Sequence, residues 1–275
     1  MSRLRVTAAA LCLASAVVGG AGSQAASGIE RLYILYCGEG TAGDISLWSP
    51  GVNVGQPMEF SVNCYLIKHA QGWLLWDTGV ADAVAAMPEG LSPRNPRMTR
   101  YRRTKTLASE LDQVGAKPAD IKFVALSHTH PDHIGNIDMF PQSTVLVQQA
   151  EYDWPTPFGQ KLRSISFPVT RLQGDHDVFG DGSVTIIATP GHTPGHQSLL
   201  VKLPKTGAIL LSGDAVHFAS NWQNRRVPEM NSDGAKTLAS MQHLSDILAK
   251  EKAQLWINHD KVQSDSLKAA RGFYD

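Results

Sequence analysis

The feature that most constrains this chain is a short run in which an apolar segment leads into four side chains able to bind metal. Residues 123–126 are apolar and predict a buried strand, and His128, His130, Asp132 and His133 follow at once. Residues two apart in an extended segment point to one face, so His128 and His130 are expected to face the same way. Asp132 and His133 come after a proline has turned the chain. Such a cluster can serve two neighbouring ions, and we expect a metal site rather than a loop whose histidines only form hydrogen bonds.

Polar side chains at the ends of other predicted strands extend this site. His192 lies in a turn stiffened by two Pro-Gly pairs, which can hold a ligand in place. Asp214 and His259 each follow an apolar run, where a carboxylate is costly to bury unless it is paired or metal-bound. Asp77 is expected to orient a ligand histidine, and His196 to have a supporting role. Nitrogen and oxygen ligands without sulfur suit zinc or another borderline divalent ion.

The rest of the chain alternates short β-rich runs with a few helical stretches. The predicted strands cover residues 31–36, 60–68, 72–76, 123–126, 144–148, 168–172, 183–188, 197–203, 208–211 and 254–257. Helices are predicted over 104–114 and 233–250, with a short one at the C-terminus and an irregular segment at 80–103. Interleaved strands and helices predict an α/β fold of two sheets packed face to face and covered outside by helices.

The long helix over 233–250 has a clear apolar pattern. Leu238, Met241, Leu244 and Leu248 recur at helical spacing, so we expect all four to be buried. Ser232 or Asp233 is the expected N-cap.

The first 26 residues have the shape of a cleaved secretory signal peptide. Two arginines precede an apolar run at 6–21, and small residues close the segment, so cleavage is expected near Ala25 or Ala26. A membrane anchor is the alternative, but Gly and Ser interrupt the short apolar run. We therefore expect one mature domain, residues 27–275, in the periplasm or outside the cell, with no stable membrane insertion after cleavage.

Charge and cysteine content limit the partners and the kind of metal site. Without Arg3 and Arg5 of the leader, 23 basic residues face 25 acidic ones, a balance that argues against a nucleic-acid partner. Cys37 and Cys64 remain after cleavage, and neither belongs to a CxxC pair. Both lie in predicted strands, so they could form a disulfide in an oxidising compartment or stay as buried thiols. The sequence leaves this choice open.

Four motifs taken together resemble a known superfamily. HTHPDH, TPGHTPGH, the Asp of SGDA and the His of INHD occur in the order found in the metallo-β-lactamase superfamily, and most resemble the N-acyl homoserine lactonases. The resemblance implies an αββα sandwich with a dinuclear metal site in the cleft between the sheets. It also implies that one metal is held by His128, His130 and His192, the other by Asp132, His133 and His259, and that Asp214 bridges both.

The resemblance implies a hydrolase that acts on a carboxylic ester bond. Two ions roughly 3.5–4 Å apart share a water whose pKa falls toward about 7, and the resulting hydroxide attacks the lactone carbonyl. Asp132 is placed to receive the proton and pass it to the ring oxygen. The expected substrate is a small lactone with an acyl chain, as in quorum quenching. The expected cofactors are two divalent ions, zinc first, with manganese, cobalt or iron as alternatives, and a homodimer is compatible with the sequence.

Other activities are also compatible with parts of this pattern. A periplasmic metallo-β-lactamase fits the leader and the histidine run, but those enzymes generally lack a bridging aspartate such as Asp214. A glyoxalase II-like thioester hydrolase would need a basic cluster near the C-terminus to hold glutathione, and none is evident. An iron-bearing oxidoreductase could use the same ligands.

One residue departs from the lactonase pattern. Lactonases of this type carry a tyrosine three residues after the bridging aspartate, and this chain has His217 there. A neutral imidazole can donate one hydrogen bond, so we expect His217 to be a catalytic residue that contacts substrate. The alternative is that it only packs or binds water.

Several large side chains in irregular segments are candidates for the wall of an acyl-chain groove. They are Met87, Met98, Tyr101, Phe218 and Trp222. The alternative is that they are core side chains of the covering loops. Arg225 and Arg226 could attract a carboxylate or be solvated.

Overall fold

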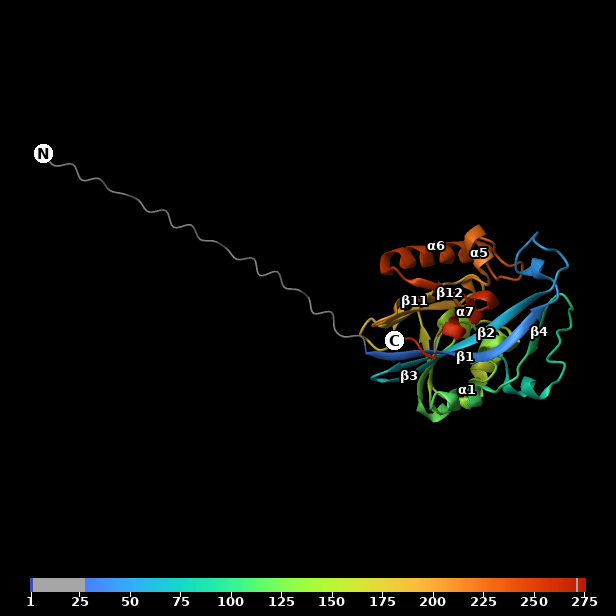
Figure 1. Ribbon diagram of the computed structural model, residues 1–275, viewed down its shortest axis with the longest axis horizontal. Coiled ribbons are helices and arrows are strands. Elements are labelled where there is room, and N and C mark those ends of the chain that lie inside the picture. The colour runs from blue at the N-terminus through green and yellow to red at the C-terminus, as the bar shows by residue number, and fades with distance from the viewer. Residues whose placement is uncertain (2–27, 271) are drawn as a thin grey trace.

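The computed structural model describes residue 1, residues 28–270 and residues 272–275 (Figure 1). The predicted signal peptide and the alternative membrane anchor lie outside the described residues. Within the described part of the chain, no helix combines the length and apolarity that a membrane crossing requires.

The larger sheet has seven strands, in the order β4-β1-β2-β3-β5-β6-β7. Their bounds are β1 Ile29–Ala42, β2 Met58–His69, β3 Gly72–Trp76, β4 Thr99–Arg102, β5 Ile121–Ala125, β6 Thr144–Gln148 and β7 Val169–Leu172. Strands β3, β5, β6 and β7 run parallel to one another, while β1 is antiparallel to both of its neighbours.

The smaller sheet has five strands, in the order β12-β11-β10-β9-β8. Their bounds are β8 His176–Asp177, β9 Val184–Ala188, β10 Gln197–Leu203, β11 Gly207–Leu211 and β12 Gln254–Trp256. Only β11 and β12 pair in parallel, so β9, β11 and β12 all run in one direction.

Helices flank both sheets. They are α1 Leu107–Gln113, α2 Pro131–Ile134, α3 Gln149–Tyr152, α4 Pro157–Ser164, α5 Ala219–Asn224, α6 Gly234–Glu251 and α7 Lys261–Ala270. Short 3-10 turns lie at η1 Ile45–Leu47, η2 Asp82–Ala86, η3 Pro118–Asp120, η4 Ile137–Met139 and η5 Gly213–Ala215. In Figure 1, α5 and α6 lie over β11 and β12, and α1 lies on the opposite side of the molecule.

Successive side chains of β3 point to opposite faces of the larger sheet, and both faces are covered. Leu74 faces the core between the sheets, with Leu199 and Leu211 of the smaller sheet in the same cluster. Leu75 faces the other way, into a cluster that contains Leu107 of α1. Both leucines are fully buried, because this sheet is covered on both faces. The predicted αββα sandwich is therefore confirmed.

The structure corrects two details of the predicted elements. Met241 and Leu244 of α6 are fully buried and Leu248 is half-buried, but Leu238 is 43% exposed, because the buried face of the helix at this end consists of Thr237 and Ser240. Asp233 is the N-cap and accepts a hydrogen bond from the Lys236 N–H at 2.9 Å. Strand β4 occupies part of the segment predicted as irregular. Its sequence, TRYR, has no apolar pattern, and it forms by pairing with the end of β1.

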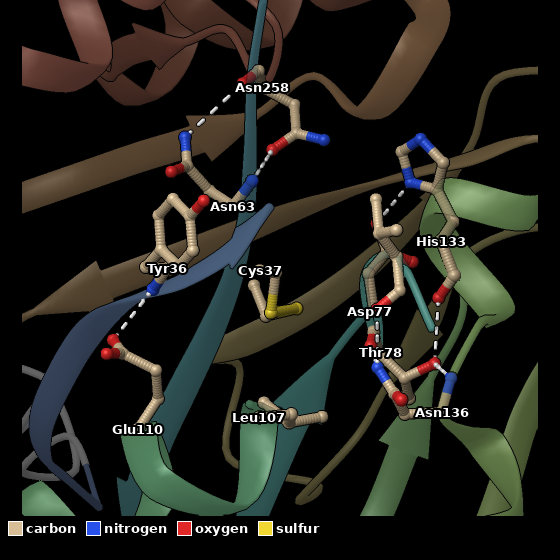
Figure 2. The surroundings of a disulfide bond; sticks show 12 residues. Tyr36, Cys37, Asn63, Asp77, Thr78, Leu107, Glu110, His133, Asn136 and Asn258 are labelled. Atoms are coloured by element: carbon tan, nitrogen blue, oxygen red, sulfur yellow. Dashed lines mark hydrogen bonds and ion pairs between the residues drawn. A yellow bond between two sulfur atoms is a disulfide. The ribbon is translucent and has the colours of Figure 1, made fainter. Parts of the chain in front are cut away.

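Cys37 and Cys64 form a disulfide that joins β1 to β2 (Figure 2). Cys37 is the extra residue in a bulge of β1, between the pairs Tyr36–Asn63 and Gly38–Val62, and this places it beside Cys64 with a Cα–Cα distance of 5.7 Å. Both sulfurs are shielded from solvent. Of the two alternatives left open by the sequence, the structure has the disulfide.

We expect the C37A/C64A double variant to lose about 3 to 4 kcal/mol of unfolding free energy, because the bond closes a loop with a sequence separation of 27 residues. Chemical denaturation under non-reducing conditions measures this loss. The reduced parent protein is the control, and a double variant as stable as the oxidised parent would contradict the prediction.

Candidate metal centre

The site lies where several strands from both sheets end. His128 follows β5, His192 follows β9, Asp214 lies in η5 after β11, and His259 follows β12. Because β9, β11 and β12 run in one direction, their last residues meet at the same edge of the smaller sheet. The end of β5 in the larger sheet faces this edge. Residues far apart in the sequence thus reach one buried point.

The first group of potential ligands contains three histidines and a carboxylate, namely His128, His130, His192 and Asp214. His130 Nδ1 lies 2.9 Å from His128 Nε2 and 3.0 Å from His192 Nε2. Asp214 Oδ2 lies 3.4 Å from His192 Nε2 and 3.8 Å from His128 Nε2. These are the residues predicted to hold one ion.

The second group contains Asp132, His133 and His259. Asp132 Oδ2 lies 3.7 Å from His133 Nε2 and 3.6 Å from His259 Nε2. Asp214 Oδ1 lies 3.4 Å and 3.1 Å from the same two nitrogens. Asp214 thus lies between the two groups, with Oδ2 near the first, Oδ1 near the second and His259 Nε2 close to both oxygens, which is the position a bridging carboxylate requires.

The residues present fit a pair of divalent metal ions. His133 Nε2 and Asp214 Oδ1 are buried and have no hydrogen-bond partner, although both point into the centre. Buried polar atoms without partners are costly, and coordination to a metal ion would satisfy them. The donor set contains only imidazole and carboxylate groups, which zinc and its neighbours accept.

Burial and charge set the protonation of the histidines. Burial lowers the pKa of His130 to about 4 and holds the pKa values of His128 and His192 well below their ordinary range. These three rings are therefore neutral at pH 7, as metal ligands must be. Burial also acts on His133, but the carboxylates of Asp214 and its neighbours outweigh it and raise the pKa of His133 well above its ordinary value.

Hydrogen bonds from the scaffold orient the ligand rings. Asp77 Oδ2 lies 2.8 Å from His133 Nδ1, as the sequence predicted (Figure 2). The other oxygen of Asp77 accepts the Ser127 N–H at 2.7 Å. His259 Nδ1 lies 2.8 Å from the carbonyl oxygen of Ser61, and His192 Nδ1 lies 2.9 Å from Asn231 Oδ1. Each contact leaves Nε2 free to face the centre. Ser61 and Asn231 carry no local sequence signal.

His196 supports the centre from outside the ligand groups. Its Nε2 accepts the backbone N–H of Asp214 at 2.8 Å, and its Nδ1 lies 2.9 Å from Thr189 Oγ1. Burial lowers the pKa of His196 to about 3, so the ring stays neutral. It holds the Asp214 backbone in place, the supporting role expected of it.

His217 lies on the other side of the same carboxylate. The side chain is 2% exposed, and its Nε2 lies 3.2 Å from Asp214 Oδ2. Asp214, His217 and His259 form a third cluster of potential ligand atoms. His217 Nδ1 is buried and has no hydrogen-bond partner. Nε2 is therefore the ring nitrogen that faces the centre.

A cavity of about 380 Å³ opens onto the centre. It is lined by Trp48, Phe60, Pro93, Arg94, Asn95, Met98, Thr99, Tyr101, His130, Pro131, Asp132, Phe158, His192, Asp214, His217, Met230 and His259. Burial raises the pKa of Tyr101 well above its ordinary value, and the nearby Asp132 raises it further. The phenol is therefore a protonated group on the cavity wall.

The cavity confirms part of the predicted groove and corrects the rest. Met98 and Tyr101 line it, but Phe218 lies behind Phe60, with the two ring centres 5.1 Å apart. Met87 is exposed and is not part of the lining.

Trp222 and the two following arginines also lie away from the cavity. The Trp222 ring stacks under the Arg225 guanidinium at 4.7 Å, and Arg225 donates to Ser245 Oγ at 2.7 Å. Arg226 is not part of the lining either, whereas Arg94 is. The positions of these side chains relative to the cavity could not be derived from local sequence patterns, because they depend on contacts with residues far away in the sequence.

Comparison with known proteins identifies the family. The profile of the metallo-beta-lactamase superfamily matches residues 57–254, so the chain belongs to this superfamily. Within it, the likeness is to the N-acyl homoserine lactonases. The chain is 35% identical over 236 residues to N-acyl homoserine lactonase AttM of Azorhizobium caulinodans, covering 80% of this chain and 90% of the relative. It is 32% identical over 250 residues to an N-acyl homoserine lactonase of Bacillus sp, covering 87% and 97%.

Solved structures agree with this assignment. An N-acyl homoserine lactone hydrolase with the product N-hexanoyl-L-homoserine at its catalytic metal centre matches with a TM-score of 0.79 at 28% identity, covering 90% of this chain and 99% of that chain. A quorum-quenching N-acyl homoserine lactone lactonase matches with a TM-score of 0.74 at 27% identity, covering 86% and 95%.

Asp44 ties together loops that build the cavity wall. Its Oδ1 accepts hydrogen bonds from Ser46 Oγ at 2.7 Å and the Gly55 N–H at 2.9 Å, and its Oδ2 accepts one from Arg97 Nε at 2.9 Å. The hydrogen bonds from Ser46 and Gly55 hold the pKa of Asp44 below its ordinary value. The cavity residue Met98 is the neighbour of Arg97.

We expect the stabilisation from Asp44 to be pH-dependent. A carboxylate whose pKa is lower in the folded state stabilises above its unfolded pKa of about 3.9, and this stabilisation is lost as the pH falls below that value. The melting temperature of the parent should therefore exceed that of D44N most clearly above pH 5, and the difference should shrink below about pH 4. A difference that is constant from pH 6 to pH 3 would contradict the prediction.

Proposed function

We propose that this protein is a dinuclear-metal hydrolase that opens the lactone ring of N-acyl homoserine lactones. The observation that carries the proposal is a set of seven His and Asp side chains, six of them buried and His130 half-buried, at the base of an apolar cavity. They form two groups that share Asp214. The relatives that match most of the chain are named N-acyl homoserine lactonases.

Two bound divalent ions would activate water at neutral pH and polarise the ester carbonyl. The chain's own residues then have three tasks. The histidines of the first ligand group present neutral nitrogens, because burial keeps the pKa values of His128, His130 and His192 low. Asp77 and Ser61 hold the rings of His133 and His259 in place. The surrounding core excludes bulk water from the base of the cavity.

Asp132 is the proposed proton carrier of the reaction. It is 5% exposed, lines the cavity, and turns Oδ2 toward His133 and His259. A carboxylate in this position can take a proton from the attacking water and deliver it to the ring oxygen as the ester bond breaks. Both product groups of a lactone stay on one molecule, so a single carboxylate can serve both transfers.

The cavity supports an acyl-chain substrate. Its walls include Trp48, Met98, Phe158 and Met230, which present apolar surface on several sides. A hydrocarbon chain gains about 0.8 kcal/mol for each CH₂ group that it buries, so a cavity of this size favours an amphipathic lactone over a compact polar one.

The rival activities receive less support. Asp214 lies between the two ligand groups, where metallo-β-lactamases generally have no carboxylate. A glutathione thioester would need basic groups at the cavity, and Arg94 is the only Lys or Arg among the lining residues.

We further propose that zinc is the native metal, with manganese, cobalt or iron as alternatives, and that the mature chain, residues 27–275, works in the periplasm or outside the cell. The Cys37–Cys64 disulfide supports an oxidising compartment. Fractionation of the producing cell tests the location. The homodimer also stays a prediction, which light scattering of the purified protein can test.

Lactone opening should depend on metal. We expect purified protein to release acid from short- and long-chain N-acyl homoserine lactones, to lose this activity after chelation, and to regain it with Zn, Mn or Co. Proton release and metal analysis measure both properties. Nitrocefin and a glutathione thioester are the comparison substrates. Full lactone turnover by metal-free protein, or preference for nitrocefin, would sink the proposal.

We expect H217A to lower kcat by about 10- to 100-fold while two ions remain bound, because His217 Nε2 faces the reacting groups. H217Y, which introduces the residue of the related lactonases, should retain more activity than H217A. Steady-state kinetics and metal analysis of both variants distinguish the alternatives. An unchanged kcat in H217A would mean that the ring only packs, and the loss of one ion would mean that it is a metal ligand.

A further inference from the structure

Glu151 is a fully buried carboxylate that no step of the proposed reaction uses. It lies in α3, the single helical turn that follows β6, and its side chain has no exposure to solvent. A buried carboxylate is stable only when its charge is compensated by hydrogen bonds or ions. Its partners therefore indicate what it does.

All four hydrogen bonds that the Glu151 carboxylate accepts come from two loops. Oε1 accepts from the Thr129 N–H and from Thr129 Oγ1, both at 2.8 Å. Oε2 accepts from Thr193 Oγ1 at 2.6 Å and from the Gly195 N–H at 3.1 Å. One oxygen serves each loop.

These two loops carry the three histidines of the first ligand group. Thr129 lies between His128 and His130, and Thr193 follows His192. The His130 and His192 ring nitrogens, one from each loop, lie 3.0 Å apart. We infer that Glu151 is a positioning residue that sets the separation of the two loops and so builds the three-histidine half of the metal centre. This inference rests on the proposed metal-dependent function.

The packing around Glu151 leaves little room for another arrangement. A Cβ on Gly195 would lie 2.2 Å from the Glu151 backbone nitrogen, so the loop contacts α3 directly. Each carboxylate oxygen faces a backbone N–H, which can only donate. In E151Q an NH₂ group replaces one of these oxygens. This NH₂ group then faces a backbone N–H, and neither of the two donors can accept a hydrogen bond.

The second ligand group has separate supports. His133 is held by Asp77, and His259 by the Ser61 carbonyl. Loss of the Glu151 carboxylate should therefore weaken one ion far more than the other. A residue that only stabilised the fold would not make this distinction between the two ions.

The test is a titration of metal-free protein with Co²⁺ and Zn²⁺ in competition with a chromophoric chelator. We expect E151Q to bind one of its two ions about 10- to 100-fold more weakly than the parent and the other within about threefold. The visible spectrum of the first bound Co²⁺ should also change. D77N disturbs His133 directly and reaches the first group only through Ser127, so it should weaken mainly the other ion, and the double variant E151Q/D77N should weaken both.

Asp181 offers a matched control. Its carboxylate also accepts hydrogen bonds from two backbone N–H groups and one hydroxyl, those of Gly28 and Ser183, and lies 3.0 Å from His69 Nε2. These contacts lie away from the metal centre. We expect D181N to bind both ions as the parent does. T193V is a milder probe, because it removes only one of the four hydrogen bonds of Glu151, and we expect an affinity loss of several-fold for the same ion.

Three outcomes would overturn the inference: E151Q binding both ions like the parent, an equal loss at both ions, or the same selective loss in D181N. If E151Q does not fold, folded T193V with unchanged affinity for both ions overturns it instead. A parent protein that binds no metal would refute the proposed function. A parent that binds two ions, together with an unaltered E151Q, would refute only the role of Glu151.

Discussion

The structure depends on one buried carboxylate. Asp214 is 4% exposed, and the Nε2 atoms of five histidines lie within 3.1–3.8 Å of its oxygens; these are His128, His133, His192, His217 and His259. Burial opposes its ionisation, but the surrounding histidines, His259 first, hold the pKa of Asp214 well below its ordinary value. The ionised carboxylate is stable here because histidines that follow strands of both sheets surround it. The sandwich fold brings the ends of these strands together.

The scaffold positions the centre through a set of polar contacts around it. Asp77 and Glu151 are buried carboxylates that accept backbone N–H groups from the ligand loops, and His196 holds the Asp214 backbone. The Cys37–Cys64 disulfide lies next to Asp77 and its neighbours (Figure 2). The Cys37 carbonyl oxygen accepts the Val80 N–H just after the Asp77 turn. The reactive residues are therefore held by rigid neighbours, as a preorganised site requires.

Local patterns in the sequence were sufficient to predict much of the fold and most of the potential metal ligands. The predicted strands 144–148 and 197–203 coincide with β6 and β10, because the apolar centre of each, 145–147 and 199–201, is fully buried. The HTHPDH run places its potential ligands within six residues. Strand β4 could not be found in this way, because its pairing with β1 involves residues about 60 positions away. The cavity wall was only partly predicted, since Trp48 and Met230 reach it from separate loops.

By itself, the sequence determined which side chains could bind metal and that they follow buried strands, because both properties depend on neighbouring residues. The tertiary structure alone decided how distant groups meet. It paired Cys37 with Cys64, moved Phe218 behind Phe60, and placed Glu151 between two ligand loops. The physical reason is that such contacts arise from the packing of two sheets and their loops, which brings together residues whose local sequences contain no information about one another.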